Sequence, residues 1–220
     1  MTALKNHTGR KTAGPFSSVL AWPCHGYTLV EMLTVIAIIA LLASLILAVI
    51  PMVRERRDKA VARAQLRALT VAINDYKSAL NEYPPDNPNA SDRPPLFYEL
   101  TGVSYGLADQ VYTNAVTAQT MRAADLPFTQ KGFRNCGADG SPGRNFYAEL
   151  KPKQYAQPQD SSNPYKDFWF VVVPVGGPNP DFNPFHYNST NPTNNPNSYD
   201  LWVDITPRGK VIRIDNWSKN

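Results

Sequence analysis

The stretch that decides the fold is Met32–Val53, MLTVIAIIALLASLILAVIPMV, in which 22 consecutive residues carry no charge. At 1.5 Å per residue, a helix of this length crosses a hydrocarbon core about 30 Å thick. Only Thr34 and Ser44 interrupt the apolar side chains, and both hydroxyls can return to backbone carbonyls of the preceding turn. The pattern therefore predicts a transmembrane helix, with a buried core helix as the alternative.

Two other N-terminal signals fit this sequence less well. A cleaved secretory signal has an apolar stretch of about 7–15 residues and a small-residue cleavage site, whereas this run is longer and leads into bases that begin at Arg54. Cys24 suggests a lipoprotein, but Pro23 stands where a small residue is needed and no apolar stretch precedes it. We therefore expect the span to remain in the mature protein as an anchor.

The positive charge of the chain is concentrated around this span. The net charge is +4, yet from residue 60 onward 15 basic residues balance 15 acidic ones. The excess bases flank the span, at Lys5, Arg10, Lys11, Arg54, Arg56, Arg57 and Lys59. A balanced domain argues against a nucleic-acid partner. Because bases lie on both sides of the span, the count of flanking Lys and Arg does not orient it.

The residues that open the span form a specific motif, Gly26-Tyr27-Thr28-Leu29-Val30-Glu31. Glu31 is a single carboxylate in an otherwise apolar helix, and a lone charge in a membrane segment by default marks a function. The arrangement resembles the N-terminal motif of type IV prepilins and of type II secretion pseudopilins. Those chains carry a basic leader ending in glycine, an aromatic residue, T-L-[VI]-E and a long apolar run. Here Tyr27 replaces the usual phenylalanine, and the leader is untypically long.

The resemblance implies that a prepilin peptidase cleaves between Gly26 and Tyr27 in the cytoplasm and that the new Tyr27 amine is methylated. It places the span in the bacterial inner membrane as a single pass, with the C-terminal domain in the periplasm. It also implies partners, namely other pseudopilins in a filament and the inner-membrane secretion assembly. No catalytic residue is expected, and no cofactor apart from the calcium considered below.

The spacing of the motif also gives Glu31 a partner. Cleavage would create an amine at Tyr27, four residues before Glu31 and hence on the same face of the helix. The two groups could pair within one subunit. In a packed filament the carboxylate could instead meet the amine of a neighbour, so that its burial is favourable only when subunits are in register. We prefer this assembly role to that of an interfacial glutamate, whose side chain is too short to reach far.

Beyond Arg54 the sequence has the pattern of an amphipathic helix without Gly or Pro up to Tyr83. Apolar residues recur at spacings of three and four, at Ala62, Leu66, Leu69, Ile73, Tyr76, Leu80 and Tyr83. Pro84 and Pro85 are expected to end this helix. We expect the stripe to pack on a sheet of the same chain, and a coiled-coil seam is the alternative.

These patterns predict an α+β fold in which a long N-terminal helix packs on an antiparallel sheet, and the resemblance implies that this fold is pilin-like. The predicted parts are the leader 1–26, the transmembrane half of the helix 27–53, its amphipathic half 54–83, and a loop-rich periplasmic β domain 84–220. The last part holds 17 of the 20 prolines, which is incompatible with an all-helical domain.

Three strands are expected in the β domain. Phe168–Val175 is apolar on both faces and should be central, whereas Tyr199–Ile205 and Lys210–Asp215 alternate and should form a hairpin through Thr206–Gly209. Cys136–Gly143 is expected to be a surface loop. Residues 176–197 are rich in Asn and Pro and are expected to form an irregular connection. The many aromatic residues more often build the core of a small sheet than a sugar-binding surface.

Few residues beyond the leader could support chemistry. Of the cysteines and histidines, only Cys136 and His186 lie beyond the leader. Two such residues are too few for a zinc site, and His186 alone is a poor basis for a nucleophile–His–carboxylate triad. The C-terminal stretch that starts Tyr199-Asp200-Leu201-Trp202 is similar to that of major pseudopilins, in which a loop binds calcium. Asp200, Asp204 and Asp215 supply the hard oxygen donors that calcium prefers. The alternative is that these three carboxylates simply face water on a hairpin.

The chain cannot form an internal disulfide after cleavage, whereas many type IV pilins close a C-terminal loop with a cysteine pair. We therefore expect a structural subunit of a type II secretion pseudopilus, closest to the major pseudopilins, and not an enzyme. A type IV pilin of a surface or DNA-uptake fibre is the alternative. A membrane-anchored periplasmic enzyme or binding domain is a more remote one.

Overall fold

The computed structural model describes residues 26–130, 132–137, 140–179 and 182–218. The chain divides into two compact units, residues 1–46 and 47–220. The longest element is helix α1, Leu29–Leu80, which contains Pro51 without ending there. The predicted leader lies outside the described residues except for Gly26.

In the first unit, α1 presents its apolar side chains outward from Leu29 to Ile46. None of the apolar window that could cross a membrane is buried in the structure, so this segment is not the core helix of the domain. The Thr34 hydroxyl donates to the Glu31 carbonyl at 2.8 Å, and the Ser44 hydroxyl donates to the Leu41 carbonyl at 2.7 Å. Both polar side chains are thus satisfied by the preceding turn, as predicted.

The end of α1 differs from the prediction by three residues. Asn81 has φ of +60°, and its N–H donates to the Lys77 carbonyl at 2.9 Å. Asparagine tolerates this left-handed conformation better than most residues and commonly ends a helix in this way. The helix therefore ends at Leu80, before Pro84 and Pro85 can act on it.

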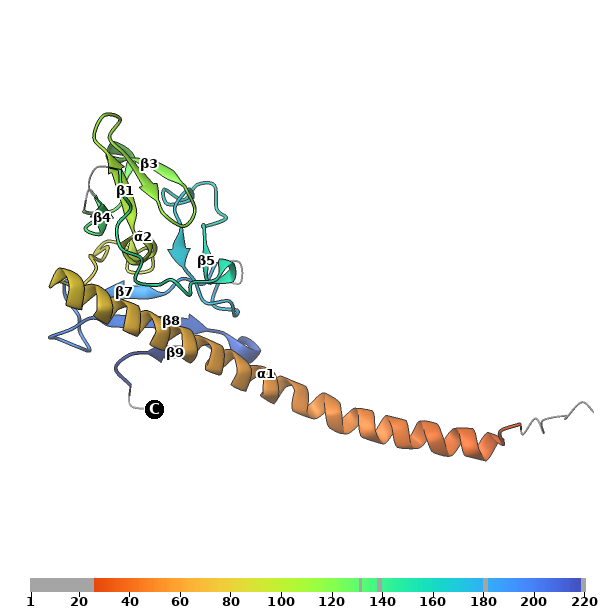
Figure 1. The fold of residues 1–220 in the computed structure, drawn as a ribbon. Coiled ribbons are helices and arrows are strands. Elements are labelled where there is room, and N and C mark those ends of the chain that lie inside the picture. The colour runs from red at the N-terminus through yellow and green to blue at the C-terminus, as the bar shows by residue number, and fades with distance from the viewer. Residues whose placement is uncertain (1–25, 131, 138–139, 180–181, 219–220) are drawn as a thin grey trace, which may run out of the picture. The chain divides into compact units, whose positions relative to one another are not determined.

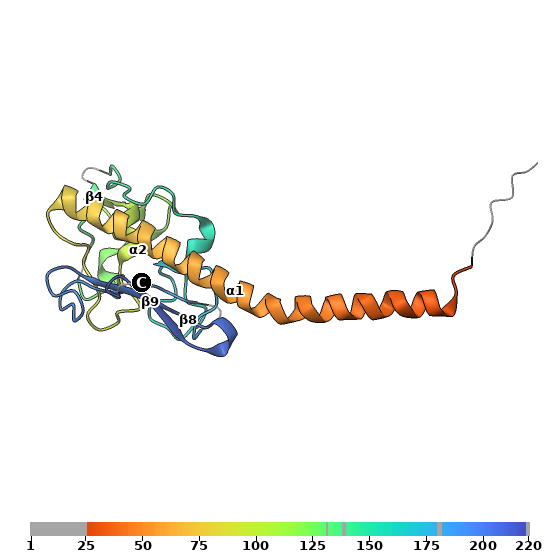
Figure 2. The same cartoon turned by 90° about the horizontal axis from the view of Figure 1, so that it is seen from below.

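In the second unit, the predicted apolar stripe of α1 faces the core. Its buried members are Ala62, Leu66, Leu69, Ile73 and Tyr76. Figures 1 and 2 show this part of α1 lying against a sheet of the same chain, which confirms that expectation over a coiled-coil seam. The buried Gln65 amide on this face donates to the Val172 carbonyl at 2.8 Å. Leu80 is 37% exposed, since it lies at the helix end.

The second unit contains one further short helix, α2 (Leu96–Thr101), and three small sheets (Figure 1). The first sheet has the order β3-β2-β1-β4, formed by β1 (Val103–Gly106), β2 (Val111–Asn114), β3 (Thr120–Arg122) and β4 (Cys136–Gly137). The second pairs β5 (Tyr155–Ala156) with β6 (Phe170–Val171). The third has the order β7-β8-β9, formed by β7 (His186–Asn188), β8 (Asp200–Ile205) and β9 (Ile212–Asp215). All pairs are antiparallel except β1 with β4. The described residues also form 3₁₀ turns at Ala123–Asp125, Pro152–Gln154 and Pro207–Gly209.

The predicted C-terminal hairpin is confirmed. In the register of β8 and β9, Trp202 pairs with Asp215 and Ile205 pairs with Ile212. Leu201, Val203 and Ile205 are buried, as the alternation along the strand requires. The core face and the outer face of this sheet therefore follow from the sequence.

One strand prediction and two loop predictions were wrong in part. The stretch Phe168–Val175 contributes only the two-residue strand β6, because beyond it the pairing shrinks to an isolated antiparallel bridge between Val172 and Pro184. The Val172 N–H donates to Gln154 in a 3₁₀ turn, and the Val173 N–H donates to Asn183. The expected surface loop begins with strand β4, parallel to β1. The expected irregular connection 176–197 contains β7, which pairs with β8.

A buried carboxylate joins the helices to the first sheet. Glu99 of α2 is fully buried and accepts three hydrogen bonds of 2.9 Å, from the Tyr76 hydroxyl of α1 and from the backbone N–H groups of Arg134 and Asn135. Burial raises the pKa of Glu99, although the three donors partly offset this effect. The protonated form is thus stabilised in the folded state relative to the unfolded chain.

The raised pKa predicts a pH dependence. Because the folded pKa of Glu99 lies above its unfolded value, its contribution to stability is complete below the unfolded pKa and falls as pH rises through the folded pKa. The difference in unfolding free energy between wild type and Glu99→Gln should therefore shrink as pH increases above about 4.5. Urea unfolding of both full chains in detergent, followed by tryptophan fluorescence, measures this difference. A difference that grows with pH would contradict the buried-carboxyl account.

Candidate functional site

The predicted cleavage point lies in an accessible part of the chain. Gly26, Tyr27 and Thr28 have no regular secondary structure, and Tyr27 is 77% exposed. A Cβ placed on Gly26 would meet no atom of the described residues within 4 Å. The fold of this chain therefore does not itself require glycine at position 26, and any requirement for it must come from the enzyme that cuts there.

Thr28 and Glu31 form a reciprocal cap at the start of α1. The Glu31 Oε2 atom accepts hydrogen bonds from the Thr28 N–H and the Thr28 hydroxyl, both at 2.8 Å. The Thr28 Oγ1 atom in turn accepts the Glu31 N–H at 3.2 Å. This is a capping box, which satisfies backbone donors that the first turn of a helix leaves unpaired. It fixes the position of the Glu31 carboxylate beside the cleavage point.

The cap leaves part of the carboxylate available. Both Thr28 donors bind Oε2, and Oε1 has no hydrogen-bond partner within the described part of the chain. A carboxylate can accept further hydrogen bonds at its second oxygen. Glu31 could therefore accept an amine without giving up its bonds to Thr28. The pairing with the Tyr27 amine stays a prediction, because that amine exists only after cleavage.

Thr28 was not singled out from the sequence, although a signal for it was present. The spacing T-x-x-E at positions 28 and 31, directly before an apolar run, is the sequence signature of a capping box. The membrane motif drew attention to Glu31 as a lone charge, whereas the cap gives the charge a local partner.

These residues lie within one recognisable sequence motif. Residues 23–47 match the family model of the prokaryotic N-terminal methylation motif. This match supports a type IV pilin-like chain that is processed by a prepilin peptidase, is anchored through a single N-terminal helix and assembles with other pilin-like subunits. No curated protein and no solved structure matches the chain.

The three candidate calcium ligands are held apart. They lie on the outer face of the β8–β9 hairpin, but Asp200 and Asp204 are four residues apart on one strand, or about 13 Å. Asp204 receives two hydrogen bonds from Arg213, at 2.9 and 2.8 Å, and Asp215 caps the turn at Trp217 and Ser218. Among the described residues, no group of three or more His, Cys, Asp or Glu could hold a metal ion. Calcium binding at these aspartates stays a prediction.

Asp200 instead organises the loop that precedes β8. Its buried carboxylate accepts the backbone N–H groups of Thr193, Asn194 and Asn195 at 2.8 to 2.9 Å, and the Asn194 side-chain amide at 3.0 Å. Four donors already satisfy this carboxylate, so a calcium ion would have to compete with them for its oxygen atoms. Asp86 does the same for another loop, since it accepts three hydrogen bonds from Ser189 and Thr190.

Replacing Asp200 by alanine should free this loop. Losing the acceptor of four hydrogen bonds should lower the unfolding free energy by about 2 kcal/mol, since unpaired donors near the surface regain water. Hydrogen exchange of residues 191–198 should accelerate. Asp160→Ala is the control, because its exposed carboxylate only caps Ser162. If both variants exchanged alike in 191–198, the anchoring role of Asp200 would be excluded.

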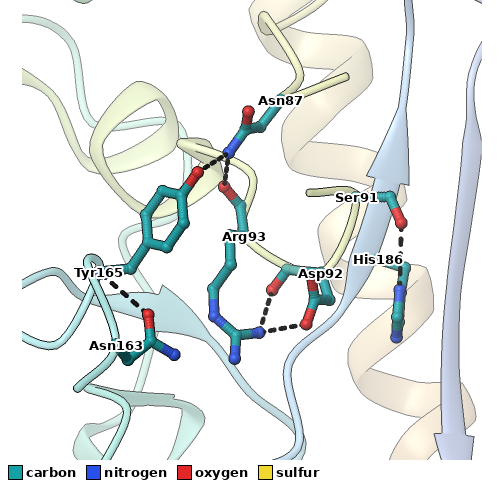
Figure 3. Close-up of polar contacts among 7 residues, drawn as sticks. All are labelled: Asn87, Ser91, Asp92, Arg93, Asn163, Tyr165 and His186. Carbon is teal, nitrogen blue, oxygen red and sulfur yellow. Dashed lines mark hydrogen bonds and ion pairs between the residues drawn. The ribbon is translucent and has the colours of Figure 1, made fainter. Parts of the chain in front are cut away.

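Figure 3 shows His186, the histidine of the described chain, in polar contact with Ser91. The Ser91 hydroxyl lies 3.4 Å from His186 Nδ1, which exceeds the 2.6–3.2 Å expected of a nucleophile and its base. No carboxylate among the described residues hydrogen-bonds the other ring nitrogen, and the ring stacks on Trp202 at 4.9 Å. Burial lowers the pKa of His186. The arrangement is that of a packed side chain rather than of a catalytic triad.

A separate set of hydrogen bonds fixes the segment that follows α1. The Asn87 amide donates to the Arg93 carbonyl and to the Tyr165 hydroxyl, both at 3.1 Å (Figure 3). The Arg93 guanidinium pairs with Asp92 and lies 4.6 Å from the centre of the Phe182 ring. Most of the aromatic residues weighed as a sugar surface are buried, namely Phe168, Phe170, Phe182, Phe185 and Tyr187. Trp202 and Trp217 lie half-buried on the outer face of the sheet.

Proposed function

We propose that this chain is a structural subunit of a type II secretion pseudopilus. A prepilin peptidase cleaves the Gly26–Tyr27 peptide bond and the Tyr27 amine is methylated. The helix then anchors the subunit in the inner membrane, with the domain in the periplasm, until the filament extracts it. The observation that carries the proposal is the methylation motif, which combines an accessible cleavage point, the Thr28–Glu31 cap and an uncovered apolar helix.

The cap supports a specific route to assembly. While the subunit is alone in the membrane, Thr28 satisfies Glu31 and lowers the cost of a carboxylate near hydrocarbon. When subunits pack, Glu31 Oε1 is in a position to accept the methylated amine of a neighbour. The charge on each amine is then compensated only at the correct register. The exposed apolar side chains of residues 29–46 would exchange lipid for neighbouring helices at little cost in hydrophobic energy.

The C-terminal region supports a pseudopilin over a type IV pilin. Cys136 is the single cysteine beyond Gly26, so no internal disulfide can close this region. Hydrogen bonds close it instead. The Asn216 side-chain oxygen accepts from the Leu201 N–H at 3.0 Å and from the Asn195 amide at 3.2 Å, next to the Asp200 cluster.

Deletion of this chain in its native host tests the proposal. Loss of secreted enzymes from the medium, with surface fibres retained and secretion restored by the wild-type gene, is the expected result. Loss of surface fibres or of DNA uptake with normal secretion would assign the chain to a type IV pilus instead. The prepilin-like processing would stand in either case.

A further inference from the structure

Bases gather where α1 leaves its apolar run. This membrane-proximal basic patch consists of Arg54, Arg56, Arg57 and Lys59 on α1, with Arg208 and Lys210 from the turn between β8 and β9. Its acidic residues are Glu55 and Asp58, so six bases stand against two acids. The segments lie about 150 residues apart in sequence, and only the fold brings them together.

The contact between the helix and the turn is direct. Glu55 Oε2 lies 3.5 Å from Arg208 Nε, and Glu55 Oε1 lies 2.7 Å from Lys59 Nζ. Glu55 thus links α1 to the turn, and its negative charge is balanced by Lys59 and Arg208. The Arg54, Arg56, Arg57 and Lys210 side chains remain exposed, and Arg208 keeps 47% of its side chain accessible.

A groove runs between the helix and the turn within the second unit. It has a volume of about 260 Å³, with Ile50, Pro51 and Pro207 as its apolar part and Arg54 and Arg208 as its bases. Two acids, Glu55 and Asp58, also line it, and the charge of Glu55 is balanced by its pairing with Lys59 and Arg208. Ile50 and Pro51 belong to the uncharged run itself. The groove is therefore continuous with the surface that contacts lipid tails if the run crosses the bilayer.

The patch lies at the depth of lipid headgroups. The uncharged run ends at Val53, and residues 54–58 rise only about 7 Å further along the helix. The headgroup layer on each side of a bilayer is about 5–7 Å thick. Val211, which is 56% exposed, follows Lys210 in the turn. An exposed apolar residue beside bases is typical of a segment that lies at a membrane surface.

The charge of the patch is not explained by membrane topology. Lys and Arg next to a span are enriched on the cytoplasmic side, whereas the proposed function puts this patch on the opposite side. Guanidinium groups bind phosphate in a bidentate manner, and each base near an anionic surface contributes to binding. A basic patch at headgroup depth, with an apolar groove beneath it, fits a phospholipid.

We propose that the membrane-proximal basic patch binds the phosphate of an anionic phospholipid, whose glycerol and upper acyl carbons lie in the groove against Ile50 and Pro51. Arg208 and Arg54 hold the phosphate from the two sides of the groove, and Lys210 adds charge. The site keeps the domain against the bilayer before assembly. Only the choice of the periplasmic leaflet rests on the proposed function.

Titration of the full chain in non-ionic detergent micelles tests this site. The probes are dioctanoyl phosphatidylglycerol, dioctanoyl phosphatidylcholine and inorganic phosphate, with binding followed by native mass spectrometry. We expect phosphatidylglycerol to bind most tightly. Arg208→Gln with Lys210→Gln should weaken its binding by about 25-fold, or about fivefold for each base. The charge-matched control is Arg122→Gln with Lys153→Gln, two exposed bases elsewhere in the domain, which should change binding less than twofold.

The other outcomes overturn the proposal in distinct ways. Equal binding of both lipids would exclude recognition of anionic lipid, and equal binding of inorganic phosphate would assign a free-phosphate site. Variants that keep lipid affinity but fail to assemble would show that the patch contacts acidic residues of a neighbouring subunit. Arg54→Gln with Arg57→Gln provides a second variant, on α1, in case the turn variant fails to fold, and it should weaken phosphatidylglycerol binding as well. Labelling of the domain from the periplasm tests the topology separately, and its failure leaves the micelle result intact.

Discussion

Replacing Glu31 by alanine is expected to abolish filament assembly while leaving membrane insertion, cleavage and the domain fold intact. Each incoming Tyr27 amine would enter an apolar environment without its counter-ion, and breaking a buried charge pair costs about 3–5 kcal/mol. Such a loss weakens each subunit addition by more than about a hundredfold. Sedimentation of sheared filaments, with total subunit measured in the membrane fraction, gives the assembled share.

Two variants separate the assembly role of Glu31 from its role in the cap. Thr28→Val removes the reciprocal hydrogen bonds but keeps the carboxylate, so it should cost about 1 kcal/mol of helix stability and only weaken assembly. Glu31→Gln keeps hydrogen bonding to Thr28 without the charge, and should fail to assemble as alanine does. Wild-type levels of filament from Glu31→Ala would reduce Glu31 to an interfacial residue.

The second large effect concerns processing. Gly26→Val should abolish cleavage, because the peptidase must accommodate the residue before the scissile bond. The chain itself should tolerate the change, since a Cβ at this position meets no atom of the described residues within 4 Å. Electrophoretic mobility during co-expression with a prepilin peptidase, together with circular dichroism of the purified full chain, measures both properties.

Tyr27→Phe is the matched control for this processing test, because it restores the aromatic residue usual in such motifs and should still be cleaved. A Gly26→Val chain cut at the wild-type rate would mean that position 26 does not define the cleavage point.

The parts of the fold that could be predicted from sequence are those that depend on local periodicity. The stripe from Ala62 to Tyr76 and the alternation along β8 each describe one element with one buried face, and both are confirmed. The helix α1 ends three residues before the predicted Tyr83, because Asn81 adopts a left-handed conformation. The prediction placed the end at the prolines that follow, which are the more obvious helix-ending signal in the sequence.

The short strands could not be predicted, because their partners are distant in sequence. The pairing of β7 with β8 depends on a loop held by Asp86 and Asp200, whose carboxylates bind backbone groups of the Asn- and Pro-rich segment. Composition marks such a segment as a loop, and nothing local indicates that its middle will pair. The length of β6 was overestimated for a related reason, since burial on both faces does not require a continuous strand.

The candidate site was predictable in outline but not in mechanism. A lone charge in an apolar run singled out Glu31, and the resemblance to prepilins implied Gly26 and Tyr27 as the processing residues, which stay a prediction. The bonds from Thr28 to a single carboxylate oxygen depend on side-chain geometry, which spacing alone does not provide. Asp200, Asp204 and Asp215 were predicted as calcium ligands, and in the structure each carboxylate accepts hydrogen bonds from the protein itself.

The central claim is that the chain is a prepilin-like precursor cut immediately before the capped helix. Mass spectrometry of the N-terminal peptide tests it most directly, on wild-type chain isolated from membranes that contain a prepilin peptidase. The account predicts that the first residue is N-methylated Tyr27, with residues 1–26 absent. A mature chain that retains its leader, or one that begins at another residue, would contradict it.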